Sequence, residues 1–506
     1  MFKKNHPHNL FSMYFRRSKF NWSLSVILLS ASFLRFYNYD TRWGLAYDQA
    51  WFAVIARHAL ATLQLPFLGP FASGGPFQTG GEWFWIVMIG TMLNPFSVIS
   101  PWVFITLLSI FQVYLLYVLG KVYGGKSLSY IVAILGAVSI SQVLQATNLT
   151  NQMPSSLCAS LLLLAIVLYL KKEKDRYLFL SGFAVGLSSS IHLQGVLLLI
   201  PLCGFLVVTK TISPKKLFLV GIGLTLPWIP VLLIDMQNNF YNTKNMLMYF
   251  TNSQSKVSYD ELGRRWLTFI TDYVPASWGR IVGGNIFLGY FEIFLVGITL
   301  LLGLFKKVID KKWIIVVGST IFMTVALRYI RTPLYENYTT FIHPFVLLLV
   351  AWSIWNIYKR NRLVAVLVLT AIVSFSLYAL WKDIGNSTNY TNITTKQYVT
   401  FLKNKFPKEK FAIYDYDYNN KQNTLPLVLY LQTEGLLDDK GHRVGMVIVA
   451  NSKIKINPHK AIYGGNGGYQ LVDLTASESA ELQKGRWAFV NPSVIYKSVQ
   501  YWYKDK

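Results

Sequence analysis

The chain is poor in charge, above all in acidic charge. Only 14% of its 506 residues are charged, and 23 Asp and Glu stand against 48 Lys and Arg. Soluble domains carry about 25% charged residues, so an ordinary soluble enzyme is excluded. A hydrophobic share of 53% equally excludes a disordered chain. The two cysteines, Cys158 and Cys203, lie in apolar runs and indicate neither a disulfide framework nor a metal site.

Long apolar runs are what the chain has instead, and its mean hydropathy is +0.37. A bilayer-crossing helix needs about 20 predominantly apolar residues. The runs predict an α-helical polytopic membrane protein with about 11 transmembrane helices. They lie at 22–39, 101–119, 127–145, 155–170, 177–190, 193–209, 217–235, 281–305, 313–330, 339–358 and 363–381.

The basic residues give this arrangement an orientation. Clusters at 3–19, 121–126, 171–176, 210–216, 306–312 and 359–362 fall on one side when the spans alternate, which predicts that side to be cytoplasmic, with the N-terminus. The alternative of a cleaved signal at Ser30-Ala31-Ser32 stays open. The net charge of +25 is then explained by membrane insertion, and no nucleic-acid partner is expected. We expect a multi-pass protein of the plasma membrane.

If residues 82–98 crossed the membrane, every later basic cluster would lie on the outer side. The predicted orientation therefore requires that they do not cross. This segment is therefore expected to be an interfacial or re-entrant helix ended by Asn94-Pro95, within a long first outer loop of residues 40–100. Residues 1–381 form the predicted membrane domain. Residues 382–506 form a small extracytoplasmic α/β domain, with strands near 408–418, 444–450 and 470–474 and helices near 393–406, 424–435 and 476–484. Glycine-rich 463–469 is interpreted as a turn.

Asp48 is the first candidate for chemistry. It opens an apolar-periodic run after the first span, where an aspartate is also a good helix N-cap. The functional interpretation is a general base at the outer face, since a carboxylate can take the proton of an attacking hydroxyl or amine. Spacing alone leaves both interpretations open.

The arrangement of Arg35 near the end of the first span, followed by Asp48 before an amphipathic helix, resembles the GT-C class of polyprenyl-phosphate-sugar-dependent glycosyltransferases. Protein O-mannosyltransferases and aminoarabinose lipid A transferases are among its members. Where the family has a pair of acidic residues, this chain has Asp48-Gln49, so the second acid is missing. Where the family has a proline-containing stretch, residues 78–83 of this chain contain no proline and carry Glu82. Residues 338–345 are similar to a later span opening of the family, with Tyr338 at its start. The second outer loop offers Asn148, Asn151 and Gln152 where some members carry an aspartate.

The resemblance implies a sugar donor on a polyprenyl phosphate and a lipid, glycan or protein acceptor in the cell envelope, protein glycosylation included. Asp48 is then the catalytic base, and Glu82 assists it or binds sugar hydroxyls. Arg328 and Arg331 are candidates to bind the departing phosphate, with snorkelling at the interface as the alternative. No metal ligand set can be read from the sequence and no cofactor is certain, although a divalent metal is compatible with the chemistry.

Three further residues are substrate-binding candidates with structural alternatives. His192 and His343 sit at outer span ends, where hydrogen-bonded packing is the alternative role. Arg35 is interpreted as a structural residue, with Asp40 as a candidate partner, and contact with phosphate is the alternative. Outside the transferase class, the sequence leaves open a transporter or flippase of lipid-linked sugars, which would need polar residues through the spans, where Glu292 is the main one. A scaffold that anchors the tail would leave the outer charged residues unexplained.

Overall fold

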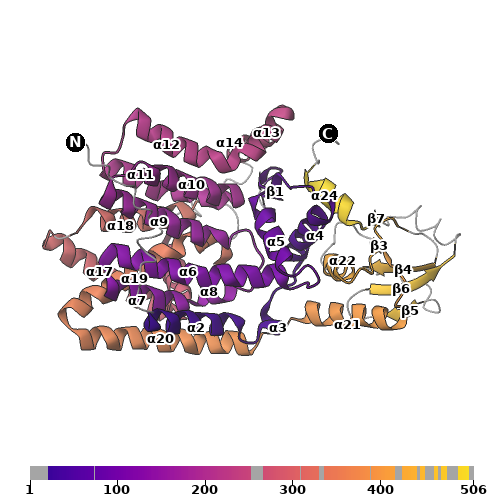
Figure 1. Cartoon of the computed structure of the whole chain (residues 1–506). Coiled ribbons are helices and arrows are strands. Elements are labelled where there is room, and N and C mark those ends of the chain that lie inside the picture. Colours follow the sequence, from indigo (N-terminus) through magenta and orange to yellow (C-terminus); the bar gives the residue numbers. More distant parts are fainter. Residues whose placement is uncertain are drawn as a thin grey trace, which may run out of the picture.

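The computed structural model is a bundle of long helices with a smaller mixed domain at one end (Figure 1). It describes residues 21–72, 75–251, 266–307, 309–329, 336–387, 389–415, 424–441, 445–450, 461–464, 469–475 and 488–500. In Figure 1 the bundle helices run side by side across the picture. α4 (Tyr47–Thr62) and α5 (Glu82–Leu93) lie steeply at the end that carries the mixed domain.

Each of the eleven predicted spans coincides with one helix or with two or three consecutive helices. They are α2 (Trp22–Phe36), α6 (Ser100–Gly124), α7 (Lys126–Ala137) with α8 (Ile140–Gln145), α9 (Pro154–Lys172), α10 (Arg176–Ile191), η1 (Leu193–Leu198) with α11 (Leu199–Val208), α12 (Pro214–Thr225) with η2 (Leu226–Trp228) and α13 (Ile229–Gln237), α17 (Ile286–Phe305), α18 (Lys311–Leu327), η4 (Glu336–Ile342) with α19 (His343–Arg360), and α20 (Arg362–Gly385). Shorter elements are α3 (Tyr39–Arg42), α14 (Tyr241–Thr251), the π-helical turn η3 (Phe269–Tyr273) and α16 (Val274–Ile281).

The predicted helical membrane fold is confirmed, but the number of crossings is not settled by helix length. Among the described residues, six helices are long and apolar enough to cross a membrane by length and composition: α6, α9, α12 through α13, α17, η4 through α19, and the helix that starts at Arg362. α2, α7 and η1 with α11 are apolar but shorter. Eleven crossings therefore stay a prediction.

The predicted non-crossing segment is helix α5. It has 12 residues, so it is about 18 Å long against a hydrocarbon core of about 30 Å. Its ring-bearing side packs on α4, where Phe52 meets Trp83 and Phe84 edge to face. A helix this short is compatible with the prediction that residues 82–98 do not cross the membrane.

Burial separates the bundle's inner helices from its outer ones. Every residue of α19 from His343 to Ile354 is buried, and α19 packs against α7, α17, α18 and α20. A helix that is apolar all round is expected to be enclosed in this way. α17 lies at the bundle surface and has only Gly289, Glu292 and Val296 buried.

Helices α10 and α12 approach each other through glycine. A Cβ built on Gly182 or Gly186 of α10 would lie 2.2 Å from a carbonyl oxygen of α12, and one on Gly223 of α12 would lie 2.2 Å from the Phe179 oxygen. Small residues allow such backbone approach between membrane helices. This contact fixes α10, whose C-terminal end carries Ser190 and leads into His192.

The mixed domain confirms the predicted α/β tail. α21 (Tyr390–Lys405) leads into β3 (Ala412–Asp415), α22 (Thr424–Thr433), β4 (Gly445–Ala450), β5 (Ala461–Gly464), β6 (Tyr469–Leu474), β7 (Ala488–Phe489) and α24 (Pro492–Gln500). The sheet order is β5-β6-β4-β3-β7; β3 and β4 are parallel and the other pairs antiparallel. The helix predicted at 476–484 and most of the glycine-rich turn lie outside the described residues.

The mixed domain packs on the first loop of the membrane domain. A single buried hydrophobic cluster contains Phe52 and Phe84 from the loop together with Val428 and Tyr496 from the tail. Thus the 381/382 boundary predicted from composition does not separate two independent cores. The tail, α4 and α5 form one unit at the same end of the bundle.

Candidate active site

A cavity of about 520 Å³ lies where the first loop meets the end of the bundle. Its walls come from segments 47–52, 70–72, 77–79, 151–152, 192–197 and 337–338, with Tyr249 and Tyr329. The segments 70–72 and 77–79 include residues of the two-stranded sheet β1 (Leu68–Phe71) and β2 (Gln78–Gly80). The cavity therefore joins elements that are far apart in the sequence.

Asp48 lies on this cavity, in the first turn of α4. The helix cap is Ala46, and Asp48 Oδ1 accepts from the neighbouring Gln49 amide at 3.0 Å. The N-cap interpretation is therefore wrong, because Asp48 is inside the helix. Its side chain remains exposed toward the cavity, while the surrounding protein removes enough water to raise the pKa of the carboxyl above its usual value.

Gln49, which follows Asp48, turns away from the cavity into the protein. It is buried, and its amide donates to Oδ1 of Asn148. The backbone adds a second link, since the Gly44 amide donates to the Thr147 carbonyl at 3.1 Å. Gln49 thus helps to hold the first loop against the 147–152 segment.

His192 and Tyr338 form the opposite wall. Their rings lie 5.5 Å apart between centroids, and Nε2 of His192 is 3.3 Å from the side-chain nitrogen of Gln152. Because an amide nitrogen donates, this contact requires a neutral imidazole that accepts at Nε2. Burial lowers the pKa of His192 to about 4, which keeps the ring neutral near pH 7. His192 is therefore a hydrogen-bonding group and not a cation in this site.

Two buried acceptors in the cavity wall have no hydrogen-bond partner among the described residues. They are Oε1 of Gln152 and Oε1 of Gln194. Leaving a buried polar group unpaired costs about 1–3 kcal/mol, so such acceptors suit a ligand that brings hydroxyl donors.

Glu82 does not line this cavity. It is buried at the start of α5, and its Oε2 accepts from Ser190 Oγ at 2.8 Å. Burial raises the pKa of this carboxyl as well. Glu82 thus links α5 to the end of α10. It does not contact the cavity directly.

Arg35 is also away from the cavity, and its partners are other residues than the candidate Asp40. Its guanidinium is fully buried and donates to Ser109 Oγ at 2.8 Å and to the carbonyls of Gly136 and Ala137 at 3.2 and 3.1 Å. These carbonyls end α7, where a cation is favoured by the unpaired carbonyl groups. The arrangement is structural: Arg35 joins α2, α6 and α7.

The remaining predicted residues are distributed around the site. His343 is buried on a separate cavity of about 20 Å³ inside the bundle, lined also by Gln112 and Gln142. Arg328 ends α18 beside Tyr329, and its guanidinium is 5.7 Å from the Trp266 ring. Arg331 lies outside the described residues.

The sequence had signals for some of the cavity residues that were not among the predicted site residues. Trp51 lies three residues after Asp48, which places both on one helix face. Asn337 directly precedes Tyr338. Gln194 and Tyr249 had no local signal, because only the tertiary fold brings η1 and α14 to the first loop.

The chain's last described residue holds one wall of the cavity. Gln500 Oε1 accepts from the amides of Phe67 and Leu68, each at 3.0 Å, and its Nε2 donates to the Leu68 carbonyl at 2.6 Å. Gln78 of β2 donates to the Val499 carbonyl at 2.9 Å. α24 therefore fixes the β1–β2 wall.

We expect Gln500→Ala to loosen this wall while the bundle stays folded. Losing buried backbone partners costs about 1–3 kcal/mol locally, which corresponds to roughly 5- to 150-fold faster amide exchange at Phe67 and Leu68. Hydrogen exchange with mass spectrometry measures it. Lys497→Ala, on the exposed side of α24, is the control, and equal protection in both variants would contradict the assignment.

The metal expectation is not resolved by the site. Within the described ranges, no group of three or more His, Cys, Asp or Glu side chains is placed to hold an ion. The cavity offers Asp48 and His192 with the amides of Asn151 and Gln152.

One family model matches the chain: "Dolichyl-phosphate-mannose-protein mannosyltransferase", over residues 83–234. This segment runs from α5 into α13 and includes Gln152 and His192, but it begins after Asp48. A search of curated proteins by sequence found no match.

Solved structures match far more of the chain. ArnT from Cupriavidus metallidurans bound to undecaprenyl phosphate is 11% identical with a TM-score of 0.62, over 91% of this chain and 99% of that chain. The oligosaccharyltransferase of Archaeoglobus fulgidus in complex with zinc and sulfate is 12% identical with a TM-score of 0.54, over 85% and 68%. AglB from Archaeoglobus fulgidus, in complex with an inhibitory peptide and a dolichol-phosphate, is 11% identical with a TM-score of 0.50, over 97% and 78%.

These matches define the fold class. The chain has the GT-C fold, with the helical membrane domain and the added mixed domain, as the resemblance in the sequence predicted. At these identities the likeness concerns the fold, and the function has to be argued from the cavity.

Proposed function

We propose that the chain is an integral membrane glycosyltransferase. It moves a sugar from a polyprenyl-phosphate donor to a lipid, glycan or protein acceptor at the outer face of the membrane. The observation that carries this proposal is the placement of Asp48 on a cavity whose walls supply unpaired amide acceptors and aromatic rings. The family model and the lipid-phosphate ligands named for the ArnT and AglB structures support the donor class.

Asp48 is the proposed base. The acceptor's oxygen or nitrogen attacks the anomeric carbon and forms the new glycosidic bond, while its proton passes to the Asp48 carboxylate. The bond from the anomeric carbon to the phosphate oxygen breaks, and the lipid phosphate leaves with the electron pair. Asp48 must be ionised to act, so the raised pKa gives a stronger base than an ordinary aspartate.

The remaining groups bind the donor. Gln152 and Gln194 accept from sugar hydroxyls, and Trp51 and Tyr338 offer aromatic faces to the sugar ring. We assign the phosphate to Arg328 and Arg331, since an arginine can contact a phosphate through two nitrogens.

Glu82 acts through Ser190 as a positioning residue rather than as a second catalytic group. No step is assigned to a metal.

Orientation follows from charge. The cavity lies at one end of the bundle, and the predicted inner clusters, such as Lys171 and Lys172 at the end of α9, lie at the other. The positive-inside bias supports an outer location for the cavity and for the mixed domain that packs on it, in a multi-pass protein of the plasma membrane.

Transport of the lipid-linked sugar is less compatible with the bundle interior. The cavity around His343 is about 20 Å³, which is room for about one water molecule.

The test is an assay of the purified chain in liposomes with a panel of labelled polyprenyl-phosphate sugars and membrane or peptide acceptors. We expect labelled product and free lipid phosphate in equal amounts. Movement of the labelled donor between leaflets without any new glycosidic bond would overturn the proposal in favour of a flippase.

A further inference from the structure

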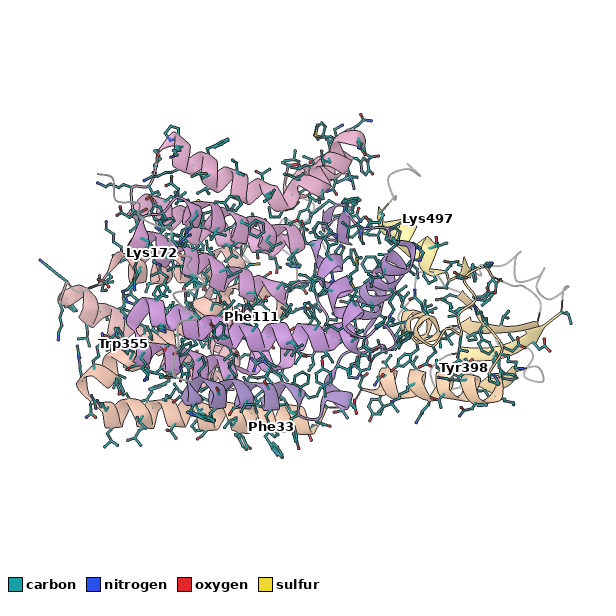
Figure 2. All side chains as sticks on the ribbon, in the orientation of Figure 1. Phe33, Phe111, Lys172, Trp355, Tyr398 and Lys497 are labelled. Atoms are coloured by element: carbon teal, nitrogen blue, oxygen red, sulfur yellow. The ribbon has the colours of Figure 1, made fainter. Side chains whose placement is uncertain are left out.

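A second cavity, of about 440 Å³, lies between α17, α18 and α19. It is at the end of the bundle opposite to the candidate active site. Figure 2 places Trp355, which lines it, at the same end as Lys172, while Lys497 lies at the other end. The proposed transfer reaction does not use this cavity.

Its rim is strongly cationic. Lys306, Lys312, Lys359 and Arg360 line the cavity, and Asp310 is the only acid among the lining residues. Asp310 is 3.0 Å from the ammonium of Lys312. One carboxylate cannot balance four cations, so about three positive charges are held together at the edge of an apolar medium, where their repulsion is weakly screened.

One of the four rim cations, Lys359, contacts an aromatic ring. The Lys359 ammonium lies 3.1 Å from the centre of the Trp355 ring. Trp313 and Trp352, which also line the cavity, stack on each other with 4.7 Å between their ring centroids. Tryptophan is characteristic of the zone where lipid headgroups meet acyl chains.

The floor of the cavity is apolar and continues to the bundle surface. Ile298 and Leu302 of α17 line it and are each 39% exposed, and Leu301 beside them is 54% exposed. In a membrane this surface faces lipid. A ligand with a charged head and a long apolar tail fits both parts, whereas a small soluble anion would use only the rim.

We propose that this cavity binds one anionic glycerophospholipid from the leaflet at that end, with its phosphate among Lys306, Lys312, Lys359 and Arg360 and its acyl chains along α17. Basic sites between membrane helices select anionic headgroups electrostatically. A zwitterionic lipid brings a cationic group that the rim repels. The site is independent of the proposed transfer reaction.

Native mass spectrometry of the full chain, with phosphatidylglycerol and phosphatidylcholine of equal chain length, tests the proposal. The wild type is expected to retain one phosphatidylglycerol at least tenfold better than phosphatidylcholine. The Lys312→Gln/Lys359→Gln variant is expected to lose this preference, and Lys312→Arg/Lys359→Arg to keep it. The arginine variant separates loss of charge from loss of folding.

Lys172→Gln/Lys174→Gln is the matched control, because it removes two cations from the same end outside the cavity. Equal retention of both lipids by the wild type, or equal loss in the control, would overturn the proposal.

Competing ligands identify the source of the phosphate. Displacement of phosphatidylglycerol by inorganic phosphate would show a simple anion site, and preferential displacement by undecaprenyl phosphate would assign the cavity to a carrier lipid; either result rejects a glycerophospholipid occupant.

Discussion

Replacing Asp48 by asparagine is expected to reduce sugar transfer by about 10²- to 10⁴-fold, the usual contribution of a general base, while the protein still folds. Asparagine keeps the size of the side chain but cannot take the acceptor's proton. Rates of lipid-phosphate release in liposomes, with size-exclusion profiles as the folding check, measure the effect. Asp40→Asn is the matched control, since Asp40 is exposed in the same loop and does not line the cavity.

The same base gives a pH dependence with a defined sign. The active form is the carboxylate, so transfer is expected to be full above the Asp48 pKa and to fall as the pH drops through it. Because desolvation raises this pKa, the fall begins at a higher pH than for an ordinary aspartate. A wild-type profile that stays flat down to pH 4, or an Asp48→Asn variant with full activity, would reject the base assignment.

Gly223→Leu is expected to prevent recovery of folded protein or to lower its stability by about 3 kcal/mol or more, because overpacking costs that much where the neighbour cannot move. The new side chain would start 2.2 Å from the Phe179 carbonyl oxygen, so α12 would have to separate from α10. Yield after size exclusion and the apparent melting temperature in detergent measure the loss.

Gly221→Leu is its control, two residues away on the same helix. A Cβ at Gly221 meets nothing within 4 Å, so this variant is expected to behave as the wild type. Equal stability of the two variants would show that the glycine contact does not hold α10 in place.

The helices were predictable because each predicted crossing is a long apolar run, a property local to the sequence. The position of Asp48 near the start of a helix was also predictable, because it depends only on the local sequence of α4. The structure excludes the N-cap role of Asp48, because the helix begins two residues earlier than that role needs. The role as a base stays a proposal.

The contacts that the sequence did not reveal involve partners distant in the sequence. Arg35 bonds to carbonyls at the end of α7, about a hundred residues away, and no pattern around Arg35 announces them. Glu82 had the residue type of a catalytic acid, yet its partner is Ser190. The contact of His192 with Tyr338 arises only when η4 packs beside the end of α10.

The docking of α24 on the first loop has a consequence for biogenesis. The β1–β2 wall is synthesised before nearly all of the bundle, whereas Gln500 follows every helix of it. During synthesis the wall stays incompletely hydrogen-bonded until the tail has been made and has folded. Completion of the cavity wall is thereby coupled to folding of the tail, and a chain interrupted before α24 would lack the contacts that fix this wall.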